Sequence, residues 1–168
     1  SNGTPILYRF QRPKAEQYPE MIELFSRQEH VLQDKNLRIS CTRIPIGDEI
    51  SSLSAILLND AYYQLLQDGV DRIDGVSVLS VPYLILFKAK AWLDLSRRRE
   101  EGERVDSKDI KKHRYDVLRL ATLLVPSKEI TITEEIFDDM KQFLNASVTD
   151  PIQVEAIGIR GISETELL

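Results

Sequence analysis

The sequence predicts an α+β protein in which a mostly antiparallel sheet comes first and helices follow. Short runs of alternating apolar and polar residues, separated by turn residues, occupy the chain up to about residue 81. Capped segments with helical apolar spacing then fill residues 82–145. Strands followed by helices are typical of the α+β class. We therefore expect a sheet region at 4–81, a helical region at 82–145, and a loosely attached tail at 146–168 with one short helix near its end.

Bulk composition excludes several classes of protein. The chain has 168 residues, enough to bury a core, and its net charge of -5 argues against a general nucleic-acid coat or a binder of anionic membranes. No apolar run approaches about 18 residues, so we expect no transmembrane helix and no membrane partner. The single cysteine rules out an internal disulfide and is consistent with the cytoplasm. The chain opens almost directly into a strand-like run without a starting Met, which predicts a fragment of a longer protein.

Alternating patterns predict the first strands. The runs at 6–11 and 21–26 would form a hairpin with a long loop, and 37–46 is a third strand. In the second run, Glu23 would share its face with two large apolar neighbours. It is either an edge-strand carboxylate that faces water or one presented on the sheet to bind a cation.

The middle of the chain carries stronger local signals. The run at 51–58 fits a strand or the start of a helix. We favour a strand, because Asn59 and Asp60 then cap a helix at 61–68 that Gly69 closes. Asp74 and Gly75 predict a tight hairpin turn between strands at 70–73 and 76–80.

Three helices follow. Pro82 opens the first, which runs to about Glu101; Asp106 or Ser107 caps the second, which runs to Leu124; and Thr133 caps the third, at 134–145. The predicted inward positions are Leu84, Ile85, Phe87, Ala91, Trp92 and Leu95 in the first helix, Ile110, Val117, Leu120, Ala121 and Leu124 in the second, and Ile136, Met140, Phe143 and Leu144 in the third.

The stretch from Lys88 to Leu120 is dense in charge. The second helix of this stretch places four polar residues at i, i+3, i+4 and i+7 on one face: Asp109, Lys112, His113 and Asp116. The same charged surface includes Lys108, Lys111, Arg114 and Arg119. One interpretation is a solvated face with weak ion pairs of about 0.3–0.5 kcal/mol each. The other is a phosphate site, since lysines neutralise phosphates and carboxylates bind Mg²⁺.

Three segments carry a resemblance to a known family: MIELFSR, PYLILFKAKAWLDL and VDSKDIKKHRYDVLRL. From about Tyr8 to Leu124 the chain resembles bacterial nucleotidyltransferase-like proteins related to the abortive-infection type toxins, a branch of the polymerase-β-like superfamily. The resemblance implies an incomplete nucleotidyltransferase-like fold that uses an NTP and Mg²⁺, with an RNA or protein acceptor and a cognate antitoxin as partners. It assigns catalytic roles to Glu23, which would also bind the metal, to Lys88 and to Asp109, and nucleotide binding to Lys90, Lys108, Lys112 and Asp116.

The chain departs from the family pattern at its start. Neither a Gly-Gly or Gly-Ser motif nor an Asp-x-Asp pair precedes Ile6. Two-metal phosphoryl transfer needs several carboxylates that converge on the ions, and Glu23 alone cannot supply them. We therefore expect a fragment that is inactive by itself. The alternative is a non-catalytic binding or regulatory module of a toxin–antitoxin or defence system.

Overall fold

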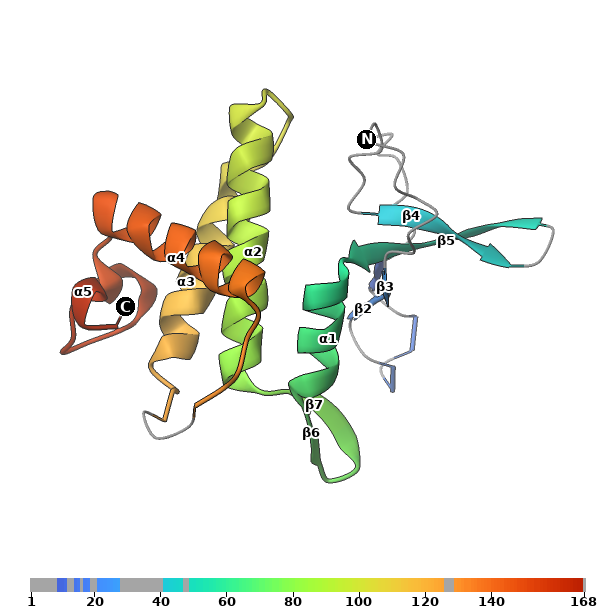
Figure 1. Cartoon of the computed structure of the whole chain (residues 1–168), viewed down its shortest axis with the longest axis horizontal. Coiled ribbons are helices and arrows are strands. Elements are labelled where there is room, and N and C mark those ends of the chain that lie inside the picture. The colour runs from blue at the N-terminus through green and yellow to red at the C-terminus, as the bar shows by residue number, and fades with distance from the viewer. Residues whose placement is uncertain are drawn as a thin grey trace. The chain divides into compact units, whose positions relative to one another are not determined.

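The computed structural model describes residues 9–11, 14–15, 17–18, 21–27, 41–46, 49–125 and 129–167 (Figure 1). The chain divides into two compact units, Ser1–Tyr63 and Gln64–Leu168. The division falls inside helix α1 (Asp60–Asp68), whereas the sequence suggested a change from sheet to helices near residue 81. The class is broadly α+β, as predicted.

The first unit begins with the predicted hairpin. Strand β1 (Arg9–Gln11) pairs antiparallel with β2 (Met21–Glu23), and Phe10 lies opposite Ile22. The predicted strand at 21–26 is, however, two strands, because the chain leaves the ladder at Leu24 and changes partner.

A second sheet follows this break. Strand β3 (Phe25–Arg27) pairs in parallel with β5 (Glu49–Leu58), which pairs antiparallel with β4 (Cys41–Ile46). The strand predicted at 51–58 is confirmed. The described strand pairs are mostly antiparallel, as predicted, and the pair of β3 with β5 is parallel. Alternation in the sequence reports a strand but not which neighbour it pairs with, so the parallel ladder was not foreseen.

Helix α1 starts at the predicted cap. The Asn59 side-chain oxygen accepts the backbone N–H of Tyr62 at 3.0 Å, and its carbonyl accepts that of Tyr63 at 2.8 Å. Arg27, at the end of β3, donates to Asp60 in the first turn at 2.7 Å. Both side chains are about half exposed, so this ion pair stabilises the junction only weakly.

The second unit opens with the predicted hairpin of β6 (Val70–Ile73) and β7 (Val76–Leu79). Its turn residues Asp74 and Gly75 have φ of 51° and 81°, the left-handed pair that a two-residue turn requires. Helix α1 ends before Gly69, as expected. Position 69 requires glycine for lack of space and not for a positive φ, because a Cβ there would lie 2.5 Å from a ring carbon of Tyr83.

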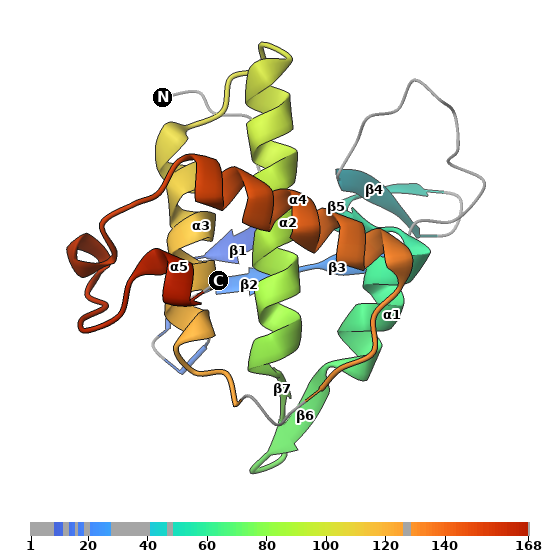
Figure 2. The ribbon, with the colours of Figure 1, turned by 60° about the vertical axis from the view of Figure 1, so that its left-hand side comes forward.

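Three helices build the main core. Helix α2 (Val81–Glu100) packs against both α3 (Ser107–Ala121) and α4 (Glu134–Thr149), and Figure 2 shows α3 running beside α2 while α4 crosses it. Ile85 and Ala89 of α2 meet Val117 of α3 and Phe143 of α4 in one buried cluster. Burial of these side chains contributes roughly 1.5–3 kcal/mol for each large apolar residue.

The ends of these helices follow local sequence signals. Asp106 accepts the backbone N–H of Lys108 at 2.9 Å, and the Thr133 hydroxyl accepts that of Ile136 at 3.4 Å, which confirms both predicted caps. Helix α3 nevertheless ends at Ala121, and Leu124, predicted to face the core, is 43% exposed. No helix in the described part of the chain is both long and apolar enough to span a membrane.

The C-terminal segment packs tightly, so the expectation of a loosely attached tail is wrong. Helix α4 continues to Thr149, and the short helices η2 (Val154–Ile157) and α5 (Glu164–Leu167) follow. Val154, Ile157 and Ile159 surround Leu118, which is fully buried, and form a second core on α3. The short helix predicted near the end is present as α5.

Candidate functional site

Two of the predicted site residues meet across the interface of α2 and α3. The Lys88 ammonium lies 2.8 Å from the Asp116 carboxylate, and the two side chains are 26% and 23% exposed. Arg119 approaches the other oxygen of Asp116 at 3.8 Å. Lys112 lies one turn before Asp116 on the same helix, at a spacing that permits an ion pair, but Asp116 pairs with a lysine 28 residues earlier.

His113 lies beside this ion pair, one turn before Asp116. Its Nδ1 is fully buried and has no hydrogen-bond partner in the described part of the chain. Burial lowers the pKa of the His113 imidazole, and the nearby Lys88 lowers it further, while Asp116 opposes the shift. His113 is therefore a neutral imidazole at pH 7.

Lys90 makes a matching contact with the other flanking helix. Its ammonium lies 2.9 Å from Asp139 of α4, and both side chains are mostly buried. One turn further along α2, burial raises the pKa of Asp94, and the charges of Lys90 and Arg97 oppose the shift. Residues two positions apart on a helix point in different directions, so Lys88 and Lys90 do not share one phosphate-binding face.

Three of the predicted site residues on α3 are exposed: Lys108, Asp109 and Lys112. Their side chains form no hydrogen bond or ion pair with any residue that the structure describes. The pairing of Asp109 with His113, which the i, i+4 spacing permits, is not formed. These side chains could meet a ligand without breaking an existing contact.

Glu23 belongs to the other unit of the chain. It ends β2, is half-buried and stands opposite Arg9 in the register. A joint site of Glu23 and Lys88 stays a prediction, since the two residues lie in different units of the chain. Within the described residues no group of three or more His, Cys, Asp or Glu side chains could hold a metal ion. Mg²⁺ binding by Glu23 stays a prediction.

The prediction that Arg114 belongs to the charged surface is wrong. Arg114 is 6% exposed and donates to the Glu164 carboxylate at 2.8 Å, to the Ser147 carbonyl at 3.2 Å and to the Asp150 carbonyl. Glu164 also accepts the Ile152 backbone N–H at 2.5 Å. The signal was available, because Arg114 falls four residues after the inward Ile110 and three before the inward Val117.

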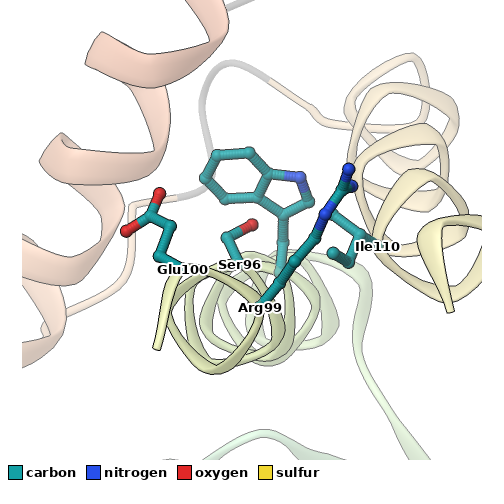
Figure 3. Close-up of a pocket in the computed structure, with 5 residues that line it drawn as sticks. Ser96, Arg99, Glu100 and Ile110 are labelled. Atoms are coloured by element: carbon teal, nitrogen blue, oxygen red, sulfur yellow. The ribbon is translucent and has the colours of Figure 1, made fainter. Parts of the chain in front are cut away.

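The structure also contains a hollow that the sequence did not predict. It has a volume of about 370 Å³ and lies at the C-terminal end of α2, beside the start of α3 (Figure 3). We call it the Trp92 hollow; its lining residues are Trp92, Ser96, Arg99 and Glu100 of α2 and Ile110 of α3. Figure 3 shows the Arg99 and Glu100 side chains on opposite sides of the hollow.

Comparisons with protein-family models, with curated proteins and with solved structures find no match for this chain.

Proposed function

We propose that the chain is part of a nucleotidyltransferase-like protein that acts in the cytoplasm. The complete protein would transfer a nucleotidyl group from an NTP, with Mg²⁺, to an RNA or protein acceptor. The three sequence segments that resemble the family support this proposal. The observation that carries it is the Lys88–Asp116 contact, which joins two of those segments at 2.8 Å in a partly buried position beside His113, whose pKa is lowered by burial.

The roles follow from exposure and charge. Lys108 and Lys112 are exposed cations that can neutralise phosphate oxygens, and Asp109 lies between them in the sequence. Lys88 is positioned by Asp116 and would exchange part of that contact for a phosphate. The described residues lack a carboxylate set for the metal, so those ligands would have to lie elsewhere, and we expect this chain to be inactive by itself.

A second candidate function is a non-catalytic binding or regulatory module, with a cognate antitoxin as its partner. It is favoured by the structural use of the charged residues. Lys88, Lys90 and Asp116 all contribute to contacts between helices, which is the arrangement expected of a scaffold.

Label transfer separates the two candidates. The protein expressed from its complete reading frame is incubated with Mg²⁺ and labelled NTPs, and label is measured in RNA and protein acceptors. We expect Lys108→Ala and Asp109→Ala to lower transfer about tenfold or more, because each removes charge near the transferred group. Lys111→Ala, an exposed lysine outside the predicted set, is the matched control and should leave transfer unchanged. Absence of both label transfer and NTP binding would leave the non-catalytic module as the function.

A further inference from the structure

We propose that the Trp92 hollow binds a neutral planar heteroaromatic ring of the nucleobase kind. Four of its five lining residues come from the last turns of α2, and Ile110 comes from the first turn of α3. None of these residues belongs to the set on which nucleotidyl transfer is proposed. The inference therefore stands on separate observations and needs neither a metal nor a triphosphate.

The Trp92 ring that lines the hollow is held by a contact with the main core. Trp92 packs edge-on against Phe143 of α4, with ring centroids 5.4 Å apart and ring planes at 89°. Phe143 is fully buried in the main core, and Ile110, which also lines the hollow, is 8% exposed. A ring that stacks on a preorganised indole avoids much of the ordering cost of binding.

The polar side chains that line the hollow have no partner among the described residues. The side chains of Ser96, Arg99 and Glu100 form no hydrogen bond or ion pair with a described residue. Their neighbours differ, since Arg97 pairs with Asp94 at 3.2 Å and Arg98 pairs with Glu103 at 2.7 Å. Of the three consecutive arginines in the last turns of α2, Arg97 and Arg98 thus form ion pairs, whereas Arg99 lines the hollow.

The arrangement of these groups selects the ligand class. Arg99 can donate hydrogen bonds and Glu100 can accept them, and Figure 3 shows the two side chains on opposite sides of the hollow. A nucleobase presents acceptors and amino donors around a flat ring, which matches such a pair. Opposite charges across the hollow favour a neutral ring over an anion. A volume of about 370 Å³ is near the lower end for small-molecule sites and suits a base with its ribose.

Trp92 is the single tryptophan of the chain, so its fluorescence reports on this hollow alone. The purified chain is titrated with adenosine and with AMP, without Mg²⁺, using excitation at a wavelength that nucleobases do not absorb. We expect saturable quenching by both compounds with similar affinity, because the phosphate is not needed. Arg99→Ala and Glu100→Ala should each weaken binding about tenfold, as expected for loss of a hydrogen bond to a charged group.

Arg97→Ala is the matched control, since Arg97 lies on the same helix and does not line the hollow. It should leave the affinity unchanged. Urea unfolding midpoints for the variants show whether they fold like the parent chain. Absence of saturable quenching, or equal weakening by Arg97→Ala and Arg99→Ala, would overturn the proposal.

A short single-stranded RNA distinguishes the sources of the ring. If it binds more tightly than adenosine and loses affinity with Arg99→Ala, the ring belongs to an RNA strand. If adenosine binds at least as tightly, the hollow takes a free nucleoside or nucleotide. Failure of this binding would not affect the transfer experiment, which varies Lys108 and Asp109.

Discussion

His113 and Arg114 are neighbours in the sequence with opposite surroundings. The His113 imidazole is half-buried beside the Lys88 ammonium, and its buried Nδ1 has no partner in the described part of the chain. Arg114 is almost fully buried, and its guanidinium lies 2.8 Å from the Glu164 carboxylate. Of these two neighbours, the buried cation has a carboxylate beside it, whereas the imidazole has an ammonium nearby.

The lowered pKa of His113 predicts a pH dependence of stability. The folded chain binds the His113 proton more weakly than the unfolded chain, where the pKa is near 6.5. The contribution to stability is therefore complete above about pH 6.5 and is lost as the pH falls through the lower folded pKa. We expect urea unfolding to show a smaller free energy of unfolding at pH 5.5 than at pH 7.5.

The matched variant is His113→Gln, which cannot be protonated in this range. Its free energy of unfolding should change less between the two pH values than that of the parent chain. The charged groups that influence His113 are Lys88 from α2 and Asp109, Lys112 and Asp116 from its own helix. An equal pH dependence in both proteins would show that His113 is not the source.

The sequence predicted single residues well where their partners are local. Asn59, Asp106 and Thr133 cap helices as expected, because a cap accepts hydrogen bonds from backbone groups two or three positions away. The partner of Asp116 could not be predicted in this way. Spacing on α3 permitted a pair with Lys112, and only the packing of α2 against α3 brings Lys88 closer.

At the scale of the element, α2 is fixed on two sides. Lys88 connects it to α3, and Lys90 connects it to α4. The apolar side chains between these helices interdigitate, which already restricts sliding along the helix axes. An ion pair on each side adds a polar contact at one axial position, so we expect both pairs to favour a single packed arrangement.

A double-mutant cycle measures the strength of this connection. We expect Lys88→Met and Asp116→Asn to show a coupling energy of about 1 kcal/mol in urea unfolding, because both side chains are mostly buried. The control is Arg97 and Asp94 on the surface of α2, which are 66% and 39% exposed. Their coupling should stay below about 0.5 kcal/mol. Equal couplings would mean that the Lys88–Asp116 contact is not maintained in solution.

The elements themselves were predicted in most cases. The hairpin at Asp74–Gly75 and the helices α2 and α3 follow from turn residues, caps and apolar spacing, which act within a few residues. The division of residues 21–27 into β2 and β3 was missed, since it depends on which distant strand is available for pairing. The end of α3 was placed too late because the apolar residues Leu123 and Leu124 continue a pattern that the helix no longer uses.

At the scale of the whole molecule, the second unit contains two cores on α3. The first is shared with α2 and α4, and the second is built by residues after Thr149. Arg114 connects the second core to the end of the chain through Glu164. The order of strands and helices was enough to predict the α+β class. The packing of the last residues was not predictable, because their apolar positions show no regular period.

We predict that Glu164→Gln destabilises this unit by roughly 2–4 kcal/mol. The change removes the buried carboxylate at 2.8 Å from the Arg114 guanidinium and leaves it the exposed carboxylate of Asp150 at 3.4 Å, which is more costly than replacing both Arg114 and Glu164 together. Chemical unfolding measures the loss, and limited proteolysis should show earlier cleavage after Asp150. Glu155→Gln, an exposed carboxylate on the same segment, is the control and should cost less than about 0.5 kcal/mol. Similar effects of the two substitutions would contradict a clamping role for Glu164.

The turn at Asp74–Gly75 has a consequence for the chemical ageing of the protein. An aspartate followed by glycine is prone to succinimide formation, because glycine does not hinder attack of its own backbone nitrogen on the aspartate side chain. Hydrolysis of the succinimide can yield isoaspartate, which inserts a methylene group into the backbone. A two-residue turn with φ of 51° and 81° fixes the register of β6 and β7, and an additional backbone atom would change the geometry of that turn. Isomerisation at this bond would therefore disturb the pairing of the two strands.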